Sequence, residues 1–473
     1  MRNAHKRNKV FFTIKTILPL LFLTVALVFG VLNIQTIRLW FAGASGEEAN
    51  IFIDTQAILG PMPRPWRNLA QGGEDHNWNM KPIVPKIAAL HPEYIRIDHL
   101  YDFFDIVSRE NGQLQFNWSK IDVLVTDILA TGAKPFFSLS YTPAALNDGN
   151  IIEPPSNYGE YQLVIQRTVE HFSKELAIEH VIYEVWNEPD LFGGWKVYGN
   201  KNYLSLYAAA ARGAQAAALR GALPFKIGGP ATTALYKNWV DSLLTFATEQ
   251  GLRLDFISWH RYDRELSVYE KDFANVSEWI GAFPQYAELE LYITEWGHDP
   301  KNDVGYDGMY AAAHTAAGAL AMTGKIQRMF VFEVQDGKDP AGQMFWGRWG
   351  LLAHQDAGNK EKSRYYALKF IDQIADQRLQ IQGTGSWVKG IAAKNGNTVE
   401  VILTNFDPLS RHTETVPLTF TNLENQNFIY KQTSLDNISR SEEIATTEAE
   451  LRVNVPMTAN SILKITLTPQ IAQ

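Results

Sequence analysis

The feature that most constrains the fold is an alternation, from about residue 51 to residue 377, of short apolar runs with longer amphipathic or alanine-rich segments. This alternation predicts parallel strands joined by crossover helices. Eight strand and helix pairs of this length favour a closed (β/α)₈ TIM barrel over an open doubly wound sheet, and no glycine-rich dinucleotide fingerprint opens the first unit. The expected strands are residues 68–73, 94–98, 134–140, 181–186, 225–229, 255–260, 291–296 and 329–334.

A different pattern begins at about residue 379. Short runs rich in β-branched residues alternate with turn residues up to the C-terminus, which predicts a small all-β sandwich. We therefore expect three parts: an N-terminal segment over 1–45, the barrel over 46–378 and the sandwich over 379–473. The aromatic residues of the last part do not gather in one stretch, which favours a role in supporting the barrel over a binding role.

The N-terminal segment has the composition of a membrane anchor. The 22 residues between Lys15 and Arg38 carry no charge, those of 17–34 are mostly apolar, and the residues before them include several lysines and arginines but no acid. This pattern predicts one transmembrane helix with its basic end in the cytoplasm and the rest of the chain outside. The alternative is a secretory signal peptide that is cleaved near Ala44. In both cases the protein works outside the cytoplasm.

Composition excludes several kinds of chemistry. A formal net charge of −8 and a charged fraction of 20% argue against a nucleic-acid partner, because phosphate binding requires a clustered basic surface. The chain has no cysteine, which excludes disulfides, thiolate metal sites and cysteine nucleophiles. No second histidine stands at metal-ligand spacing from His260, so we predict neither a catalytic metal nor a cofactor. The oligomeric state is left open.

Two glutamates stand where the chemistry of a barrel is usually placed. Glu188 follows the fourth expected strand and Glu295 ends the seventh. Functional side chains of such barrels project from the C-terminal ends of the strands, so both carboxylates are expected in one cavity. Glycosidic cleavage requires such a pair: one carboxyl group protonates the departing oxygen, while the other attacks the anomeric carbon or activates water there.

Five segments, in order, resemble glycoside hydrolase family 39. This family of clan A retaining (β/α)₈-barrel glycosidases includes β-xylosidases, α-L-iduronidases and some bacterial exopolysaccharide hydrolases. The segment YEVWNEPDL at 183–191 carries an Asn-Glu-Pro motif that is moderately specific by itself. The other four segments are KPFFSLSYTPAAL at 134–146, IGGPATT at 227–233, DFISWHRY at 255–262 and LYITEWG at 291–297. The resemblance covers about residues 60 to 378.

The resemblance implies a role for each matching residue. It makes Glu188 the general acid/base and Glu295 the nucleophile, and it implies that Asn187 binds the 2-hydroxyl of the sugar. Glu188 then has to be protonated near neutral pH, whereas Glu295 has to be ionised. Arg96, at the end of the second strand, is expected to place a cation beside Glu295.

Further substrate-binding residues follow from the ends of the remaining strands. The resemblance implies that Tyr262 hydrogen-bonds the nucleophile and that His260 lines the cavity. Trp296 adjoins Glu295, and its flat side chain is expected to form the wall on which the sugar packs. At strand eight the chain departs from the xylosidase-like pattern and places Glu333 near the cavity, which puts xylose specificity in doubt.

The resulting prediction is a retaining O-glycoside hydrolase that acts by double displacement on an oligosaccharide or polysaccharide outside the cell. The two carboxyl groups should then lie about 5–5.5 Å apart. The alternatives are a transglycosylase with the same residues and a catalytically silent barrel that binds glycans.

Overall fold

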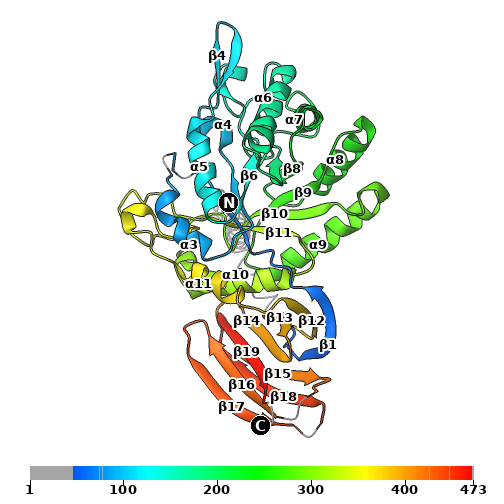
Figure 1. Ribbon diagram of the computed structural model, residues 1–473, viewed down its shortest axis with the longest axis vertical. Helices are drawn as coiled ribbons and strands as arrows, with labels where there is room; N and C mark the ends of the chain where they lie inside the picture. Colours follow the sequence, from blue (N-terminus) through cyan, green and yellow to red (C-terminus); the bar gives the residue numbers. More distant parts are fainter. Residues whose placement is uncertain (1–45, 74, 77, 425–426, 447, 471–473) are drawn as a thin grey trace, which may run out of the picture. The chain divides into compact units, whose positions relative to one another are not determined.

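The computed structural model describes residues 46–73, 75–76, 78–424, 427–446 and 448–470 (Figure 1). The expected membrane anchor at 17–34 and the candidate cleavage site near Ala44 lie outside these residues. Within the described ranges, no helix is both long enough and apolar enough to cross a lipid bilayer. The anchor therefore stays a prediction.

Eight parallel strands form a closed barrel, as the sequence predicts (Figure 1). Their order around the ring is β10-β11-β2-β3-β6-β7-β8-β9, so each strand pairs with the barrel strands before and after it in the chain. All eight expected runs contribute a strand, with shifts of a few residues at the ends. The strands are β2 (Asn68–Gln71), β3 (Tyr94–Ile97), β6 (Lys134–Ser138), β7 (Val181–Glu184), β8 (Phe225–Thr232), β9 (Phe256–Tyr262), β10 (Glu290–Gly297) and β11 (Arg328–Phe332).

Helices cover the outside of the ring. The long ones are α5 (Ser119–Ala130), α6 (Tyr158–Glu170), α7 (Tyr203–Leu219), α8 (Lys237–Gln250), α9 (Leu266–Gly281), α10 (Met309–Met322) and α11 (Ser363–Ile371), and α3 (Val84–Ala88) and α4 (Leu100–Phe103) are short. The alanine-rich faces of α7 and α10 are buried, as expected for helices that pack closely on the barrel wall.

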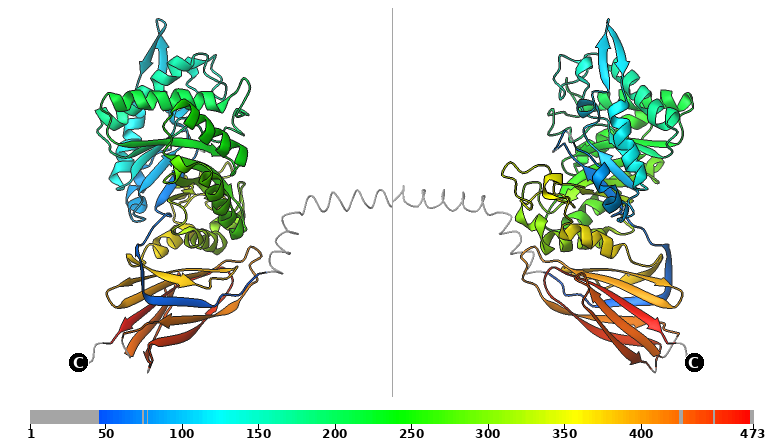
Figure 2. Two further views of the ribbon diagram at one scale, coloured as in Figure 1. Left: turned by 90° about the vertical axis from the view of Figure 1, so that its right-hand side faces the viewer. Right: turned by 60° about the vertical axis from the view of Figure 1, so that its left-hand side comes forward.

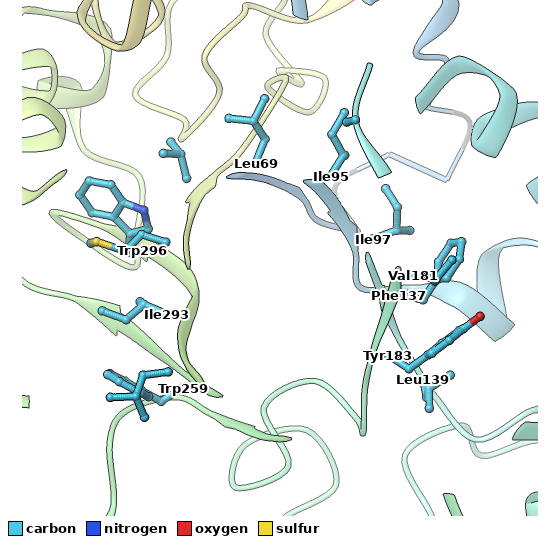
Figure 3. Close-up of a cluster of buried hydrophobic side chains, with 14 of the residues drawn as sticks. Leu69, Ile95, Ile97, Phe137, Leu139, Val181, Tyr183, Trp259, Ile293 and Trp296 are labelled. Carbon is cyan, nitrogen blue, oxygen red and sulfur yellow. The ribbon is translucent and has the colours of Figure 1, made fainter. Parts of the chain in front are cut away.

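Alternation along each strand separates two apolar layers. On β3, Ile95 and Ile97 lie in the large core between strands and helices, on the outer side of the ring in Figure 3. Tyr94, on the same strand, belongs instead to a smaller cluster inside the barrel, together with Phe136 and Phe330. Since side chains alternate between the two faces of a strand, Arg96 has the inward orientation of Tyr94.

The second domain is mostly sheet, and it also uses a strand from before the barrel. Its nine strands have the order β17-β16-β19-β14-β13-β12-β1-β15-β18. They are β1 (Ile51–Pro61), β12 (Gln377–Gln382), β13 (Val388–Asn395), β14 (Thr398–Asn405), β15 (Glu414–Thr421), β16 (Asn427–Ser434), β17 (Ser439–Ala445), β18 (Glu450–Met457) and β19 (Ser461–Pro469). Strands that are not neighbours in this order share one apolar core, which is the packing expected of a sandwich.

The position of β1 differs from the expected domain boundaries, which assigned it to the barrel. It pairs antiparallel with β12 and parallel with β15, more than 300 residues away. In its first half, buried residues such as Ile51 and Ile53 alternate with more exposed ones. This alternation suits a strand with one buried face, whereas barrel strands are buried on both faces. The sheet domain is therefore built from both ends of the described chain, and Figure 2 shows the blue strand β1 among the orange and red strands of the C-terminal part.

Candidate active site

A cavity of about 720 Å³ lies at the C-terminal ends of the barrel strands. Its wall combines three carboxylates with a set of aromatic and apolar side chains. The lining residues are Gly73, Asp98, His99, Tyr141, Asn187, Glu188, Leu191, Phe192, Thr233, Tyr262, Glu295, Pro300, Phe332 and Trp349. Of the residues singled out in the sequence, Asn187, Glu188, Tyr262 and Glu295 face this cavity directly.

The two glutamates from β7 and β10 meet in this cavity. A carboxylate oxygen of Glu188 and one of Glu295 lie within 4.8 Å of each other. His260 stands between them: its Nδ1 is 2.9 Å from Oε1 of Glu188 and 3.5 Å from Oε2 of Glu295. This separation suits a carboxylate that attacks carbon directly, because water-activating pairs stand about 6.5–9.5 Å apart.

Arg96 is hydrogen-bonded to three residues of the site. Its guanidinium donates to Glu184 Oε2 at 2.8 Å, to Glu295 Oε1 at 2.9 Å and to Asn187 Oδ1 at 2.7 Å. The side chain is fully buried, so these charge-assisted bonds are shielded from water. Arg96 thus lies beside Glu295 as predicted, and it also fixes the amide of Asn187.

Tyr262 and Asn187 complete the contacts around the two carboxylates. The hydroxyl of Tyr262 donates to Glu295 Oε2 at 3.0 Å, so both oxygens of this carboxylate accept a hydrogen bond. The Nδ2 of Asn187 donates to the hydroxyl of Tyr141 at 3.2 Å. With its oxygen bound to Arg96, the Asn187 amide has a defined orientation at the cavity wall.

Burial sets the electrostatics of this group. Burial raises the pKa of Glu295 to about 7, although the charges of His260 and Arg96 act in the opposite direction. The pKa of His260 is also raised: burial lowers it, but Glu295 and the hydrogen bond to Glu188 outweigh that effect. The hydrogen bonds from Arg96 and Tyr262 favour the ionised form of Glu295 and so oppose the effect of burial.

The backbone around Glu188 has an unusual conformation that holds the carboxylate at the strand tip. Trp186 and Glu188 have φ angles of 75° and 46°, in the left-handed region that side chains other than glycine seldom adopt. Three hydrogen bonds hold the turn: Ser138 Oγ to the carbonyl of Trp186, Trp186 Nε1 to the carbonyl of Phe192, and the amide of Glu188 to the carbonyl of Ala231. These bonds offset the conformational cost.

The prediction for Trp296 is wrong. Its side chain is fully buried in the layer between the barrel and the helices, on the outside of the ring (Figure 3). A Cβ added to Gly318 of α10 would lie 2.8 Å from the Trp296 ring, which shows how closely the helix packs on it. The reason is alternation along β10: because Glu295 points inward, its neighbour points outward. Trp349 and Phe332 face the cavity instead.

Glu333 lies next to the cavity but behind its surface. It follows β11, is fully buried, and accepts a hydrogen bond from Gln71 Nε2 at 3.0 Å. Three further residues line the cavity and were not predicted from the sequence: Asp98, His99 and Tyr141. Asp98 could have been found, since it stands two residues after Arg96 and so shares its inward face.

The close approach of Glu188, His260 and Glu295 also meets the distance requirement of a cation site, since one ligand atom of each lies within 4.8 Å of the others. The same atoms are the carboxylates and the histidine already described. The expectation that no catalytic metal is needed stays a prediction.

Loss of Arg96 is expected to destabilise the fold. Arg96→Met leaves the buried carboxylates of Glu184 and Glu295 without their cation, which should lower the free energy of unfolding by about 3–5 kcal/mol. Urea denaturation monitored by tryptophan fluorescence measures the change. The matched control is Arg109→Met, which removes an ion pair with Glu160 at the surface and should leave the midpoint close to wild type. Equal midpoints for the two variants would contradict the role of Arg96.

A parallel barrel that brings two carboxylates this close, from its fourth and seventh strands, defines a retaining glycoside hydrolase. The sequence pattern of glycosyl hydrolases family 39 matches residues 53–439, and the chain belongs to this family.

Individual relatives agree with this assignment. A β-xylosidase of Caldicellulosiruptor saccharolyticus is 27% identical over 371 residues, which span 70% of this chain and 73% of that protein. The α-L-iduronidase of Homo sapiens is 22% identical over 275 residues, which span 52% of this chain and 41% of that protein. A crystal structure of a monomeric β-xylosidase from Caulobacter crescentus CB15 superimposes with a TM-score of 0.72 at 23% identity, covering 89% of this chain and 100% of the other. That likeness shows a common fold.

Proposed function

We propose that this enzyme cleaves O-glycosidic bonds by double displacement, with Glu295 as the nucleophile and Glu188 as the general acid/base. The observation that carries the proposal is the approach of the two carboxylates to within 4.8 Å in one cavity. A covalent mechanism uses two carboxyl groups about 5–5.5 Å apart, and this approach is closer to that separation than to the ~6.5–9.5 Å of enzymes that place a water molecule between carboxylate and sugar.

In the first step, Glu188 protonates the glycosidic oxygen while an oxygen of Glu295 bonds to the anomeric carbon and the leaving group departs. In the second step, Glu188 removes a proton from water, which displaces Glu295 and releases the sugar. Arg96 and Tyr262 orient the attacking carboxylate through its two oxygens. Asn187 is in place to bind the 2-hydroxyl, a contact that strengthens as positive charge develops at the anomeric carbon.

The proposed substrate is a glycan outside the cytoplasm. The relatives named as β-xylosidases support a xyloside-like neutral glycone, and the basic and apolar N-terminal segment supports action at the outer face of the cell membrane. An exported exopolysaccharide with neutral sugars agrees with both features, because an enzyme anchored at the outer face of the membrane meets such a polymer as it leaves the cell.

Covalent trapping tests the proposed mechanism. The protein is incubated with a panel of activated 2-fluoro glycosides, digested and analysed by peptide mass spectrometry. A sugar adduct on the peptide that carries Glu295, absent in Glu295→Gln, is the expected result and names the accepted glycone. An adduct on another carboxylate would overturn the assignment. No adduct from any sugar, in folded protein, would favour the silent glycan-binding barrel.

The pH dependence of the reaction should respond to Tyr262. Its hydroxyl stabilises the ionised form of Glu295, so Tyr262→Phe should raise the pKa of this carboxyl group further above its usual range. Because the reaction needs Glu295 ionised, the acidic limb of kcat/KM should move to higher pH by about one unit. A pH profile measures the shift. Tyr198→Phe, at an exposed tyrosine of the loop after Glu188, is the control and should leave the profile unchanged.

A further inference from the structure

Two opposite sides of the cavity differ in how far they are open to solvent. One side is formed by Asp98, after β3, and by Phe332 and Trp349 from the end of β11 and its loop, which are 5%, 8% and 9% exposed. The other side is formed by Leu191 and Phe192, which follow β7 and are 61% and 42% exposed. In the order of the ring, β7 lies opposite β11. A ligand that fills the cavity is therefore enclosed at one end and reaches solvent at the other.

The open side of the cavity is also the side of the general acid. The amides of Leu191 and Phe192 donate to the carbonyl of Glu188 at 3.0 and 2.7 Å, so both residues lie in one turn with the acid. In the proposed mechanism Glu188 protonates the glycosidic oxygen, and this oxygen departs with the leaving group. The leaving group must then lie beside this turn, while the sugar that Glu295 attacks occupies the enclosed part.

Close packing holds the turn that carries Leu191 and Phe192. The side chain of Trp186 donates through Nε1 to the carbonyl of Phe192 at 3.0 Å. Gly193, the next residue, has a φ angle of 100°, and a Cβ at this position would lie 2.5 Å from the carbonyl oxygen of Ile152. The chain here approaches its neighbours as closely as only glycine allows. The two exposed side chains are therefore a fixed part of the cavity wall.

The polar groups on the open side are engaged with one another. Among the described lining residues on this side, Thr233 is the one polar side chain besides Asn187 and Glu188. Its hydroxyl donates to Asp190 Oδ2 and lies 3.2 Å from the hydroxyl of Tyr236, and its amide donates to Asp190 Oδ1 at 3.0 Å. Apart from the catalytic pair of residues, this side thus presents mainly apolar surface to a ligand.

We propose that Leu191 and Phe192 form the leaving-group subsite, and that this subsite selects its ligand by apolar area rather than by the configuration of hydroxyl groups. The inference rests on the proposed function, because a leaving group exists only if Glu188 and Glu295 cleave a glycoside. An alkyl or aromatic group packs directly on the two side chains, and a sugar packs on them through its C–H face. The subsite therefore accepts different sugars as leaving groups and favours those with apolar substituents.

The first test compares the ethyl and hexyl glycosides of the sugar that labels Glu295 in the trapping experiment. Ethanol and hexanol have nearly the same acidity, so the two leaving groups differ in apolar area and hardly in reactivity. The kcat/KM of the hexyl glycoside should exceed that of the ethyl glycoside by at least about tenfold, which corresponds to burial of two of the added methylene groups. Release of the free sugar, measured by chromatography, gives both rates.

A double variant links this preference to the two side chains. Leu191→Ser combined with Phe192→Ser removes the apolar surface, so the hexyl preference should fall to about threefold or less. General damage to the barrel would lower both rates and leave their ratio unchanged. The matched control Leu219→Ser replaces a leucine that is 80% exposed at the end of α7, and it should keep the wild-type ratio.

A second comparison asks whether hydroxyl configuration matters. The accepted sugar is linked to C6 of glucose or to C6 of galactose, and these two leaving groups differ in the configuration of one hydroxyl group. Their kcat/KM values should agree within about threefold, whereas a subsite built to hydrogen-bond a hydroxyl group discriminates by up to ~10⁴-fold.

Three outcomes would overturn the inference: a hexyl preference below about tenfold in the wild type, a difference above about threefold between the glucose and galactose leaving groups, or a hexyl preference that persists in the double variant. The wild-type comparisons decide the matter even if the double variant does not fold. Failure of the proposed function has a different signature, since none of the glycosides would be cleaved and no sugar would label Glu295.

Discussion

Glu295→Gln is expected to lower kcat by about 10⁵-fold on nitrophenyl glycosides of the accepted sugar. The amide has nearly the shape of the carboxylate, and its oxygen can still accept from Arg96, but it cannot form the glycosyl ester. Because the lost group makes and breaks the covalent bond, kcat should fall much more than KM rises. Initial rates over a range of substrate concentration separate the two parameters.

The matched control for this variant is Glu290→Gln on the same strand. Glu290 begins β10, at the opposite end of the barrel from the cavity, and forms an ion pair with Lys226. The same chemical change at this position should leave kcat within a few-fold of wild type. If the two variants lose activity to a similar extent, the loss reflects the barrel as a whole and Glu295 is not the nucleophile.

Glu188→Ala should show an effect that depends on the leaving group. For substrates whose leaving group needs a proton, kcat/KM is expected to fall by about 10³-fold. Dinitrophenyl glycosides depart without protonation, so their first step should be nearly unchanged, while the second step lacks its general base. A burst of dinitrophenol followed by slow turnover is the expected time course.

Azide distinguishes loss of the acid/base from general damage in Glu188→Ala. The small anion can occupy the space of the missing carboxylate and attack the glycosyl ester without a base, so turnover of the dinitrophenyl substrate should recover. A glycosyl azide with the configuration of the substrate should form. Chloride at the same ionic strength is the control and should restore nothing. Failure of azide to accelerate turnover, with the covalent adduct present, would remove Glu188 from this role.

The barrel and its two carboxylates were predictable because the information is local. Eight apolar runs of strand length predict eight strands, and all eight are present in the barrel. Glu188 and Glu295 follow such runs directly, so the rule that functional groups lie at the C-terminal ends of barrel strands places both in one cavity. Arg96 stands at the end of such a run as well, whereas the role of Tyr262 was implied by the family resemblance; both contact Glu295.

Two errors in detail have different causes. Trp296 was assigned to the cavity by its nearness to Glu295 in the chain, although a period of two places neighbouring side chains on opposite faces of a strand. The outward orientation of Trp296 was therefore predictable from the sequence. The pairing of β1 with β12 and β15 was not readable, because more than 300 residues separate the partners and no local pattern specifies which distant strand edge a strand will join.

The chain of amino acids alone was sufficient for the eight strands of the barrel and for the pair of carboxylates, since both depend on residue type and short-range spacing, whereas the retaining class was implied by the resemblance of five segments to a known family. The folded molecule was needed for the position of His260 between the glutamates and for the three bonds of Arg96. These features depend on distances between side chains from different strands. Only closure of the ring brings such side chains within hydrogen-bonding range, and burial then changes their charge.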